Sequence, residues 1–358
     1  MGRTAVAILN TENLLHNLTI IKSRAPKSAI MAMIKANAYG HGLRSTALRL
    51  DGHVASFGVA SIDEALALRK VGIRSKITLM EGVFEPAELV SASLENFDVV
   101  FHNHEQVSWL ENAALASPLG VWLKVDTGMG RLGFNLDEAQ ALLKKLSLCF
   151  VQRPLGIMSH FACADEREHV HNNFQIKQFQ DLITNFSGTK SFNNSAAIFN
   201  FPDSNYDVVR PGLALYGVSP VFGTLGSDLL LKPVMTLQTS LIAVRQEKKG
   251  AFIGYGGTYR CPEDMPVGIM AMGYGDGYPQ KNSNNTPVLV NNIRCQLIGR
   301  VSMDMAAVDL RACPQSRLGD PVTLWGAQLP LEEIASYTGR TAYDLLCAVQ
   351  SRVKFQWT

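Results

Sequence analysis

The sequence predicts an α/β fold in which a (β/α)8 barrel is followed by a mostly β domain. Two observations carry this prediction. Up to about residue 225, strand-like apolar runs alternate with amphipathic helical segments, and beyond it strand-like runs follow one another through turns. Alternation implies parallel pairing, and eight such units match a closed barrel better than an open sheet. Because 358 residues exceed one ordinary core, we place a barrel domain at 1–225 and a β domain at 226–358.

The first domain contains eight runs of strand length. They are 29–34, 54–60, 76–80, 97–101, 120–125, 155–160, 190–193 and 206–209. Most are separated by helical patterns, at 61–72, 105–115, 137–146 and 168–186. Ser61 and Glu64 have the spacing of a capping box that would open the first of these helices. Ahead of the barrel, 4–9 is a possible strand, followed by a helix that stops before Pro26.

The second domain is expected to be built from short strands joined by turns. The candidate strands are 234–244, 266–272, 288–290, 294–298, 305–310 and 321–325. Asn291 and Asn292 are suited to a two-residue hairpin between two of them. Helical patterns return only at 331–337 and 343–351.

Composition excludes several classes of protein. Apolar residues make up 47% of the chain and charged residues 18%, which is a globular composition. A net charge of +2 gives no reason to expect nucleic acid or an anionic membrane as a partner, and no apolar run is long enough to span a bilayer. The six cysteines form no CxxC pair, so we expect free thiols, no metal site and a cytoplasmic location.

Lys35 is the first candidate for chemistry. It ends the apolar run 29–34 and is followed at once by the loop Gly40-His41-Gly42. A lysine with its stem in an apolar wall would have a lowered pKa, and a neutral amine is what a Schiff base with an aldehyde requires. The alternative, a lysine that snorkels at the sheet edge, is about as well supported by the sequence.

Further polar residues stand at the carboxyl ends of other strands, where a barrel places its active site. Arg131, His160 and Arg210 follow the fifth, sixth and eighth strands. Taken singly, each has an ordinary explanation as a surface ion pair or a core histidine. The loops after the last two strands supply Asn194, Ser195 and Gly212, an arrangement suited to a phosphate; ordinary helix capping by Ser195 explains it equally well.

Gly128-Met-Gly-Arg-Leu-Gly133 matches the GxGxxG pattern of dinucleotide sites. It follows the fifth strand, however, and the next strand ends in Ser159-His160, where a dinucleotide site requires an acidic residue. We therefore do not expect a nicotinamide site. In the second domain, 254–259 and 273–279 are glycine-rich and present tyrosines, which suits turns or a phenol offered to a ligand.

The stretch Lys35-Ala-Asn-Ala-Tyr39-Gly-His-Gly resembles the pyridoxal-phosphate lysine motif of alanine racemases. The resemblance extends in the same order over nearly the whole chain, through 123–133, 159–160, 194–195, 209–216, 254–259, 273–278, 299–304 and 341–353. It implies a pyridoxal 5′-phosphate barrel and a β domain, assembled as a homodimer with shared active sites. Val353 is followed by Lys354 where the family usually has proline, which puts the C-terminal edge in question.

The resemblance also implies roles for individual residues. Lys35 would hold the cofactor and act as the base on D-alanine, and Tyr255 of the partner subunit would act on L-alanine. Arg131 would lie near the substrate carboxylate, and Lys124 resembles a family lysine that is often carbamylated to orient that arginine. Arg210 would face the pyridine nitrogen, and His160 would lie against the ring. The remaining contacts with the cofactor would come from Tyr39, Asn194, Ser195, Gly212, Leu213 and Tyr343. Those with the substrate would come from Met303 and Asp304.

These residues predict an alanine racemase that uses two bases, one on each face of the substrate. Such an enzyme would supply D-alanine for peptidoglycan or feed alanine catabolism. A related barrel decarboxylase would want an acid where Arg210 stands, and a pyridoxal-phosphate carrier would lack residues 226–358. A broad-specificity amino-acid racemase stays open as an alternative.

Overall fold

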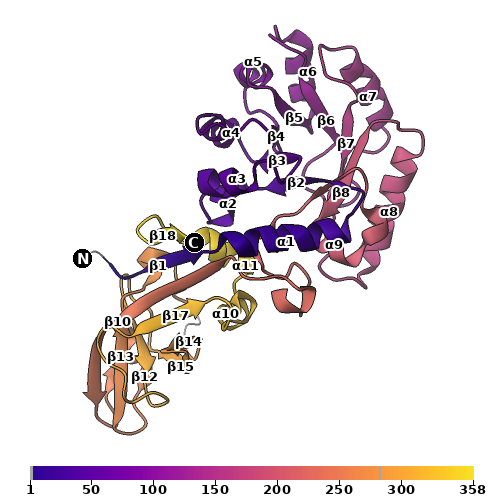
Figure 1. The fold of residues 1–358 in the computed structure, drawn as a ribbon. Helices are drawn as coiled ribbons and strands as arrows, with labels where there is room; N and C mark the ends of the chain where they lie inside the picture. The colour runs from indigo at the N-terminus through magenta and orange to yellow at the C-terminus, as the bar shows by residue number, and fades with distance from the viewer. Residues whose placement is uncertain (1–2, 282–283) are drawn as a thin grey trace. The chain divides into compact units, whose positions relative to one another are not determined.

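The computed structural model describes residues 3–281 and 284–358, which form two compact units. One unit comprises 17–215 with 219–224, and the other comprises the described residues up to His16 together with 216–218 and 225–358. Each unit is described by itself (Figure 1).

The first unit is a closed barrel of eight parallel strands. They are β2 (Ala29–Met33), β3 (Ser56–Val59), β4 (Lys76–Leu79), β5 (Phe97–Phe101), β6 (Gly120–Lys124), β7 (Gly156–Met158), β8 (Thr189–Asn194) and β9 (Val208–Arg210). Each strand pairs with the next, and β9 pairs with β2 to close the ring. Each observed strand overlaps one of the eight predicted runs, so the predicted barrel is confirmed.

Helices lie on the outside of the barrel strands (Figure 1). They include α3 (Leu43–Leu50), α4 (Ile62–Arg69), α5 (Pro86–Leu94), α6 (His104–Asn112), α7 (Ala139–Ser147) and α8 (Val170–Ile183). The predicted capping box at the start of α4 is wrong. Ser61 makes no side-chain cap bond, and the Glu64 carboxylate instead accepts from the backbone N–H groups of Ala60 and Ala36, both at 2.8 Å.

The barrel interior is closed by large side chains rather than open as a pore. Strands β3 and β6 are buried along their whole length. A buried cluster from β2, β5, β6, β7 and the end of β4 consists of Met31, Met33, Met80, Val100, Trp122 and Met158, with Tyr39 packed against it. Burial on both faces explains why these strands appear in the sequence as continuous apolar runs.

The second unit is built on an eight-stranded sheet in the order β13-β16-β15-β14-β17-β10-β1-β18. Its strands are β1 (Val6–Leu9), β10 (Met235–Glu247), β13 (Met265–Met270), β14 (Pro287–Val290), β15 (Ile293–Ile298), β16 (Ala306–Asp309), β17 (Pro321–Trp325) and β18 (Lys354–Trp357). An additional pairing of β10 with β13 closes six of them into a ring. A separate small ribbon is formed by β11 (Phe252–Ile253) and β12 (Tyr259–Arg260).

The ends of the chain meet within this sheet. Strand β1 pairs antiparallel with β10 and parallel with β18, whose first residue Lys354 lies opposite Val6. The edge where the sequence departs from the family pattern is therefore an ordinary strand. The hairpin between β14 and β15 is confirmed, because Asn291 and Asn292 have φ values of 50° and 64°, as a primed turn requires.

Two helices complete the β unit, α10 (Leu331–Thr338) and α11 (Ala342–Ala348), both within or near their predicted ranges. The remaining helices are α1 (Thr11–Arg24), the five-residue α2 (Lys35–Tyr39) and α9 (Ser195–Asn200). Among the described residues, every helix is too short or too polar to cross a lipid bilayer.

Candidate active site

Lys35 opens an unusual turn directly after β2. Four consecutive residues, Ala36, Asn37, Ala38 and Tyr39, have φ values between 51° and 56°, the left-handed region that non-glycine residues avoid. Such residues cost about 1–2 kcal/mol each, so the turn must be held by its surroundings. The Glu64 carboxylate accepts from the N–H of Ala36, and the Asn37 side chain accepts from the N–H of Leu43 at 2.9 Å.

The amine of Lys35 lies at the rim of the barrel beside a carboxylate. The side chain of Lys35 is 37% exposed, and its Nζ lies 3.7 Å from Glu81 Oε1. The buried lysine of the barrel mouth is Lys124, at the end of β6, which is only 7% exposed. Burial, and after it the positive charges of Arg210, Arg131 and Lys35, lower the pKa of Lys124 to about 8.

Arg210 lies at the end of β9 and is buried among neutral partners. Its guanidinium donates to the Ser191 hydroxyl and to the carbonyls of Ser159 at 2.5 Å and Phe192 at 3.1 Å. Burial lowers its pKa to about 10, so it stays charged at neutral pH.

His160 follows β7 and is held neutral. Arg210 Nη2 lies 3.2 Å from His160 Nδ1, and an arginine can only donate, so Nδ1 carries the lone pair and Nε2 the proton. Burial, then the charges of Arg210 and Lys124, lower the pKa of His160 well below its usual range. The imidazole therefore offers a neutral face and an N–H rather than a charge.

The loops after β8 and β9 are joined by one hydroxyl. Ser195 Oγ accepts from the N–H of Gly212 at 2.7 Å and of Ala214 at 3.3 Å. Helix α9 is capped by Asn194, whose side chain accepts from Ala197 N at 3.0 Å, so the alternative of capping by Ser195 is wrong.

Gly212 is a place of close approach. A Cβ at this position would lie 2.3 Å from the Tyr39 hydroxyl, so only glycine lets the phenol reach this loop. Leu213, the next residue, is buried and begins a short 3-10 turn (Leu213–Tyr216). The strained turn after β2 and the loops after β8 and β9 thus converge around one corner of the mouth.

The glycine pattern at 128–133 does not form an empty phosphate loop. The Asp126 carboxylate accepts from the N–H groups of Gly128, Met129 and Gly130, each at 2.8 Å. A carboxylate of this chain already occupies the position that a phosphate takes in a dinucleotide site. Arg131 sits exposed on this loop, near enough for its charge to lower the pKa of both Lys124 and His160.

Sequence reasoning missed two supporting residues. Ser191, on β8, is a hydroxyl acceptor for Arg210. Gln175, buried on α8, donates to the carbonyl of His160 at 3.0 Å and accepts from the N–H of Ala162 at 2.8 Å. Both are polar residues in otherwise apolar positions of their elements, and that is the only signal the sequence offered.

The β unit carries the other predicted residues. Tyr255 lies in the loop between β11 and β12 with its side chain 73% exposed. A Cβ on Gly254 would lie 3.5 Å from the backbone of Arg300, so this loop runs beside residues 299–305, which contain Met303 and Asp304. Tyr343 is on α11.

The barrel residues thus form one site, and Tyr255, Met303 and Asp304 lie on neighbouring loops of the β unit. At the barrel mouth, the pKa of Lys124 responds to three other cations, Lys35, Arg131 and Arg210, and to the carboxylate of Glu81, which lies 3.7 Å from Lys35 Nζ. Mutual repulsion of this kind is relieved by an anion. A phosphorylated cofactor fits the charge of the mouth and the cradle at Gly212.

Comparison with protein families decides the class. The model described as the alanine racemase N-terminal domain matches residues 9–220, and the alanine racemase C-terminal domain matches residues 234–357. The chain belongs to the alanine racemase family.

Relatives and solved structures agree with the alanine racemase assignment. An alanine racemase of Coxiella burnetii is 46% identical over 357 residues and covers 98% of both chains, and one of Legionella pneumophila is 43% identical over 99% of this chain and 100% of its own. The crystal structure of the biosynthetic alanine racemase from Pseudomonas aeruginosa has a TM-score of 0.96 at 39% identity and covers 99% of each chain. The chain is an isomerase of this kind.

Proposed function

We propose that this protein interconverts L-alanine and D-alanine with pyridoxal 5′-phosphate, as a homodimer whose subunits share their active sites. The observation that carries the proposal is the group of cations at the barrel mouth, whose buried member Arg210 is surrounded by neutral acceptors. An anionic, phosphorylated cofactor provides the missing negative charge. We infer a cytoplasmic location because the spacing of the six cysteines in the sequence indicates no disulfide framework.

Pyridoxal phosphate supplies an aldehyde for the amino group and a conjugated ring that acidifies the α-proton. The residues that would hold it are Lys35 at the aldehyde, Tyr39, Asn194, Ser195, Gly212, Leu213 and Tyr343 around the phosphate, and His160 and Arg210 at the ring. At neutral pH His160 is neutral and Arg210 is protonated, so neither would change its protonation state when the cofactor binds. If Arg210 contacts the ring nitrogen, it would leave that nitrogen unprotonated, which we expect to suppress side reactions such as transamination.

Racemisation requires a proton to leave one face of the α-carbon and another to arrive on the opposite face. We assign Lys35 Nζ to one face and the Tyr255 phenol of the partner subunit to the other. The exposure of both groups in a single chain is consistent with a shared site that closes on assembly. Arg131 would bind the substrate carboxylate, and Met303 and Asp304 would limit the size of the side chain that is accepted.

We assign Lys124, in a carbamylated form, to the orientation of Arg131. Its amine is buried and its pKa is lowered to about 8, so a substantial neutral fraction exists near neutral pH and can add to carbon dioxide. Carbamylation would replace the Lys124 cation by an anion close to the positive charges of Arg131, Arg210 and Lys35, and so reduce their mutual repulsion. Incubation with 13C-bicarbonate should give a carbamate carbon resonance that is lost in Lys124→Met.

The deciding experiment follows both enantiomers with three variants. Lys35→Ala should lose the covalently attached chromophore and all racemisation. Tyr255→Phe should keep the chromophore but slow racemisation by about a hundredfold or more, because general acid–base catalysis on one face is lost. In deuterated water this variant should still exchange the α-proton of D-alanine, where Lys35 acts.

Tyr337→Phe is the matched control, because Tyr337 is another half-exposed tyrosine of the β unit, on α10. It should leave both rates unchanged. Full-speed racemisation by Tyr255→Phe, or a retained covalent chromophore in Lys35→Ala, would contradict the proposal. Release of carbon dioxide from basic amino acids would favour the decarboxylase, and equal turnover of serine a broad-specificity racemase. D-alanine dependence of a deletion strain would distinguish a peptidoglycan role from a catabolic one.

A further inference from the structure

A buried carboxylate lies behind the loops that carry Met303 and Asp304. Asp276, in the glycine-rich turn at 273–277, is only 1% exposed. Arg3 Nη2 lies 2.6 Å from its Oδ2, and Arg352 Nε lies 3.0 Å from its Oδ1 as an ion pair. The N–H of Gly273 donates to Oδ2 at 2.9 Å. A carboxylate removed from water to this extent requires such compensation, and two guanidinium groups supply it.

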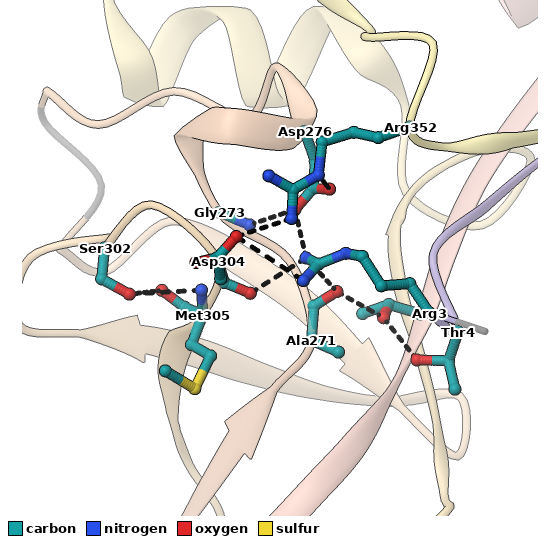
Figure 2. Close-up of polar contacts among 10 residues, drawn as sticks. Arg3, Thr4, Ala271, Gly273, Asp276, Ser302, Asp304, Met305 and Arg352 are labelled. Carbon is teal, nitrogen blue, oxygen red and sulfur yellow. Dashed lines mark hydrogen bonds and ion pairs between the residues drawn. The ribbon is translucent and has the colours of Figure 1, made fainter. Parts of the chain in front are cut away.

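The same two arginines also hold Asp304. Arg352 Nη2 lies 2.6 Å from Asp304 Oδ1, and Arg3 Nη2 donates to the Asp304 backbone carbonyl at 3.1 Å. Figure 2 shows both guanidinium groups directed toward the Asp276 and Asp304 carboxylates. Arg3 comes from the segment before β1 and Arg352 from the segment before β18, so the two ends of the chain meet at this point.

The turn that contains Asp276 is in direct backbone contact with Met303. The N–H of Gly275 donates to the Met303 carbonyl at 2.9 Å, and that of Tyr274 donates to the Ser302 carbonyl at 3.0 Å. A Cβ on Gly273 would lie 2.3 Å from the Met303 carbonyl oxygen, so the two loops touch. Any shift of the Asp276 turn is therefore transmitted to Met303.

The side chains of Met303 and Asp304 themselves are poorly anchored by packing. They are 53% and 44% exposed, respectively. Their position depends on the backbone beneath them and on the two guanidinium groups. We propose that Arg3 and Arg352 are positioning residues that fix Met303 and Asp304 for substrate through the buried carboxylate of Asp276.

This inference rests on the proposed function, in which Met303 and Asp304 line the substrate pocket. Loss of either arginine should loosen the wall of the pocket without touching the two bases. Substrate binding is then weakened while the proton transfers proceed, so KM rises and kcat is nearly kept. A looser wall should also discriminate less well against a side chain larger than methyl, which raises the serine-to-alanine ratio of kcat/KM.

The test is steady-state racemisation by the holoenzyme of wild type, Arg3→Met, Arg3→Lys and Arg352→Met. Wild-type racemisation is measured first, so that failure of the proposed function is seen separately. We expect Arg3→Met to raise KM for L-alanine about tenfold, as for loss of one charged hydrogen bond, with kcat changed less than about twofold. Arg3→Lys keeps the positive charge but loses the paired N–H donors of the guanidinium group. Its KM should therefore lie between those of wild type and Arg3→Met.

Arg311→Met is the matched control. Arg311 also bridges two carboxylates of the β unit, Asp309 at 2.7 Å and Glu263 at 2.6 Å, but has no contact with the loop at 302–305 in the described structure. It should leave KM unchanged. Hydrogen–deuterium exchange of the peptide covering 299–305 should accelerate in Arg3→Met and not in Arg311→Met, and this readout does not depend on racemisation.

A double-mutant cycle with Asp304→Asn shows whether Arg352 acts through the Asp304 carboxylate, from which its Nη2 lies 2.6 Å away. The effect of Arg352→Met on KM should largely disappear in the Asp304→Asn background. An unchanged KM and unchanged exchange in both Arg3→Met and Arg352→Met overturn the inference. The inference is also overturned if Arg311→Met changes kcat and KM as much as Arg3→Met and Arg352→Met do. The two arginines would then act only on the stability of the β unit. Should Arg3→Met not fold, Arg3→Lys and Arg352→Met decide by the same criteria.

Discussion

Two buried charges, Arg210 in the barrel and Asp276 in the β unit, are treated in opposite ways by this chain. The Asp276 carboxylate forms ion pairs with two guanidinium groups and accepts a backbone N–H, so its negative charge is compensated within the β unit. Arg210 is met by a hydroxyl, carbonyls and a neutral imidazole, and other cations stand nearby. The first arrangement stabilises structure, whereas the second leaves positive charge for something that the chain does not itself provide. The predictions below test this difference.

The largest effect is expected where a buried charge is fully paired. Asp276→Asn should leave the guanidinium groups of Arg3 and Arg352 without their buried partner and lower the free energy of unfolding by about 4 kcal/mol. Urea unfolding followed by circular dichroism measures it. Asp264→Asn serves as the control, because Asp264 pairs with Lys248 at the surface, and such pairs contribute little. Equal losses in both variants would contradict the contrast.

The opposite sign is expected at the barrel mouth. The folded-state pKa of Lys124 is lowered to about 8 from 10.5, so below pH 8 its buried charge opposes folding, and this penalty is relieved as pH rises through 8 to 10.5. Lys124→Met should therefore raise the stability of the cofactor-free protein at pH 7 by about 2 kcal/mol. It should also flatten the rise of stability with pH in that window. Thermal unfolding across pH checks both points, and a loss of stability at pH 7 would contradict the interpretation of an uncompensated charge.

Ser195 offers a smaller, local test of the phosphate corner. Ser195→Ala removes the acceptor for the buried N–H groups of Gly212 and Ala214, which should cost about 1–2 kcal/mol. The same two N–H groups are released toward the cofactor, so cofactor affinity should fall less than stability does. Ser147→Ala is the control, since its exposed hydroxyl only bonds a carbonyl within its own helix. Absorbance titration with pyridoxal phosphate and urea unfolding measure the two quantities.

The sequence predicted the barrel well because a strand that is buried on both faces appears in the sequence as a short apolar run. Strands such as 97–101 and 120–124 are mostly apolar, and the alternation of strands with helices along the chain implied parallel pairing. The edges of the β unit were harder. Strand β18 has a half-exposed, alternating pattern and forms only because β1 lies beside it, some 350 residues earlier in the chain. Pairing across such a distance leaves no local pattern.

The roles of the candidate site residues stay a prediction, and the conformation of the turn after Lys35 was not predicted from the sequence. Ala36, Asn37, Ala38 and Tyr39 have no intrinsic preference for a left-handed turn, and a carboxylate on another helix, Glu64, helps to hold them there. The same carboxylate was expected to cap its own helix. In both cases a tertiary contact overrode a correct local preference, and the contact became visible only in three dimensions.

His41 gives the smallest and most specific test, because it lies next to the strained turn. It is fully buried, its Nδ1 lies 2.9 Å from the Tyr39 carbonyl, and burial lowers its pKa to about 4 from 6.5. Between pH 6.5 and pH 4, His41 is protonated in the unfolded chain but not in the folded one. The free energy of unfolding therefore falls as pH drops through this range. Between pH 7 and pH 6 the contribution of His41 to this loss should be about 0.7 kcal/mol in wild type.

His41→Asn should lose the share of the acid sensitivity that His41 contributes even if it is less stable throughout, because asparagine does not titrate, while the share from buried His160 should remain. His53→Asn is the control, since His53 is exposed and should leave the slope as it is. If the turn at 36–39 relies on a neutral imidazole, cofactor affinity should decline over the same pH range in wild type but not in His41→Asn. An identical acid slope in both proteins would contradict the lowered pKa of His41 in the folded protein.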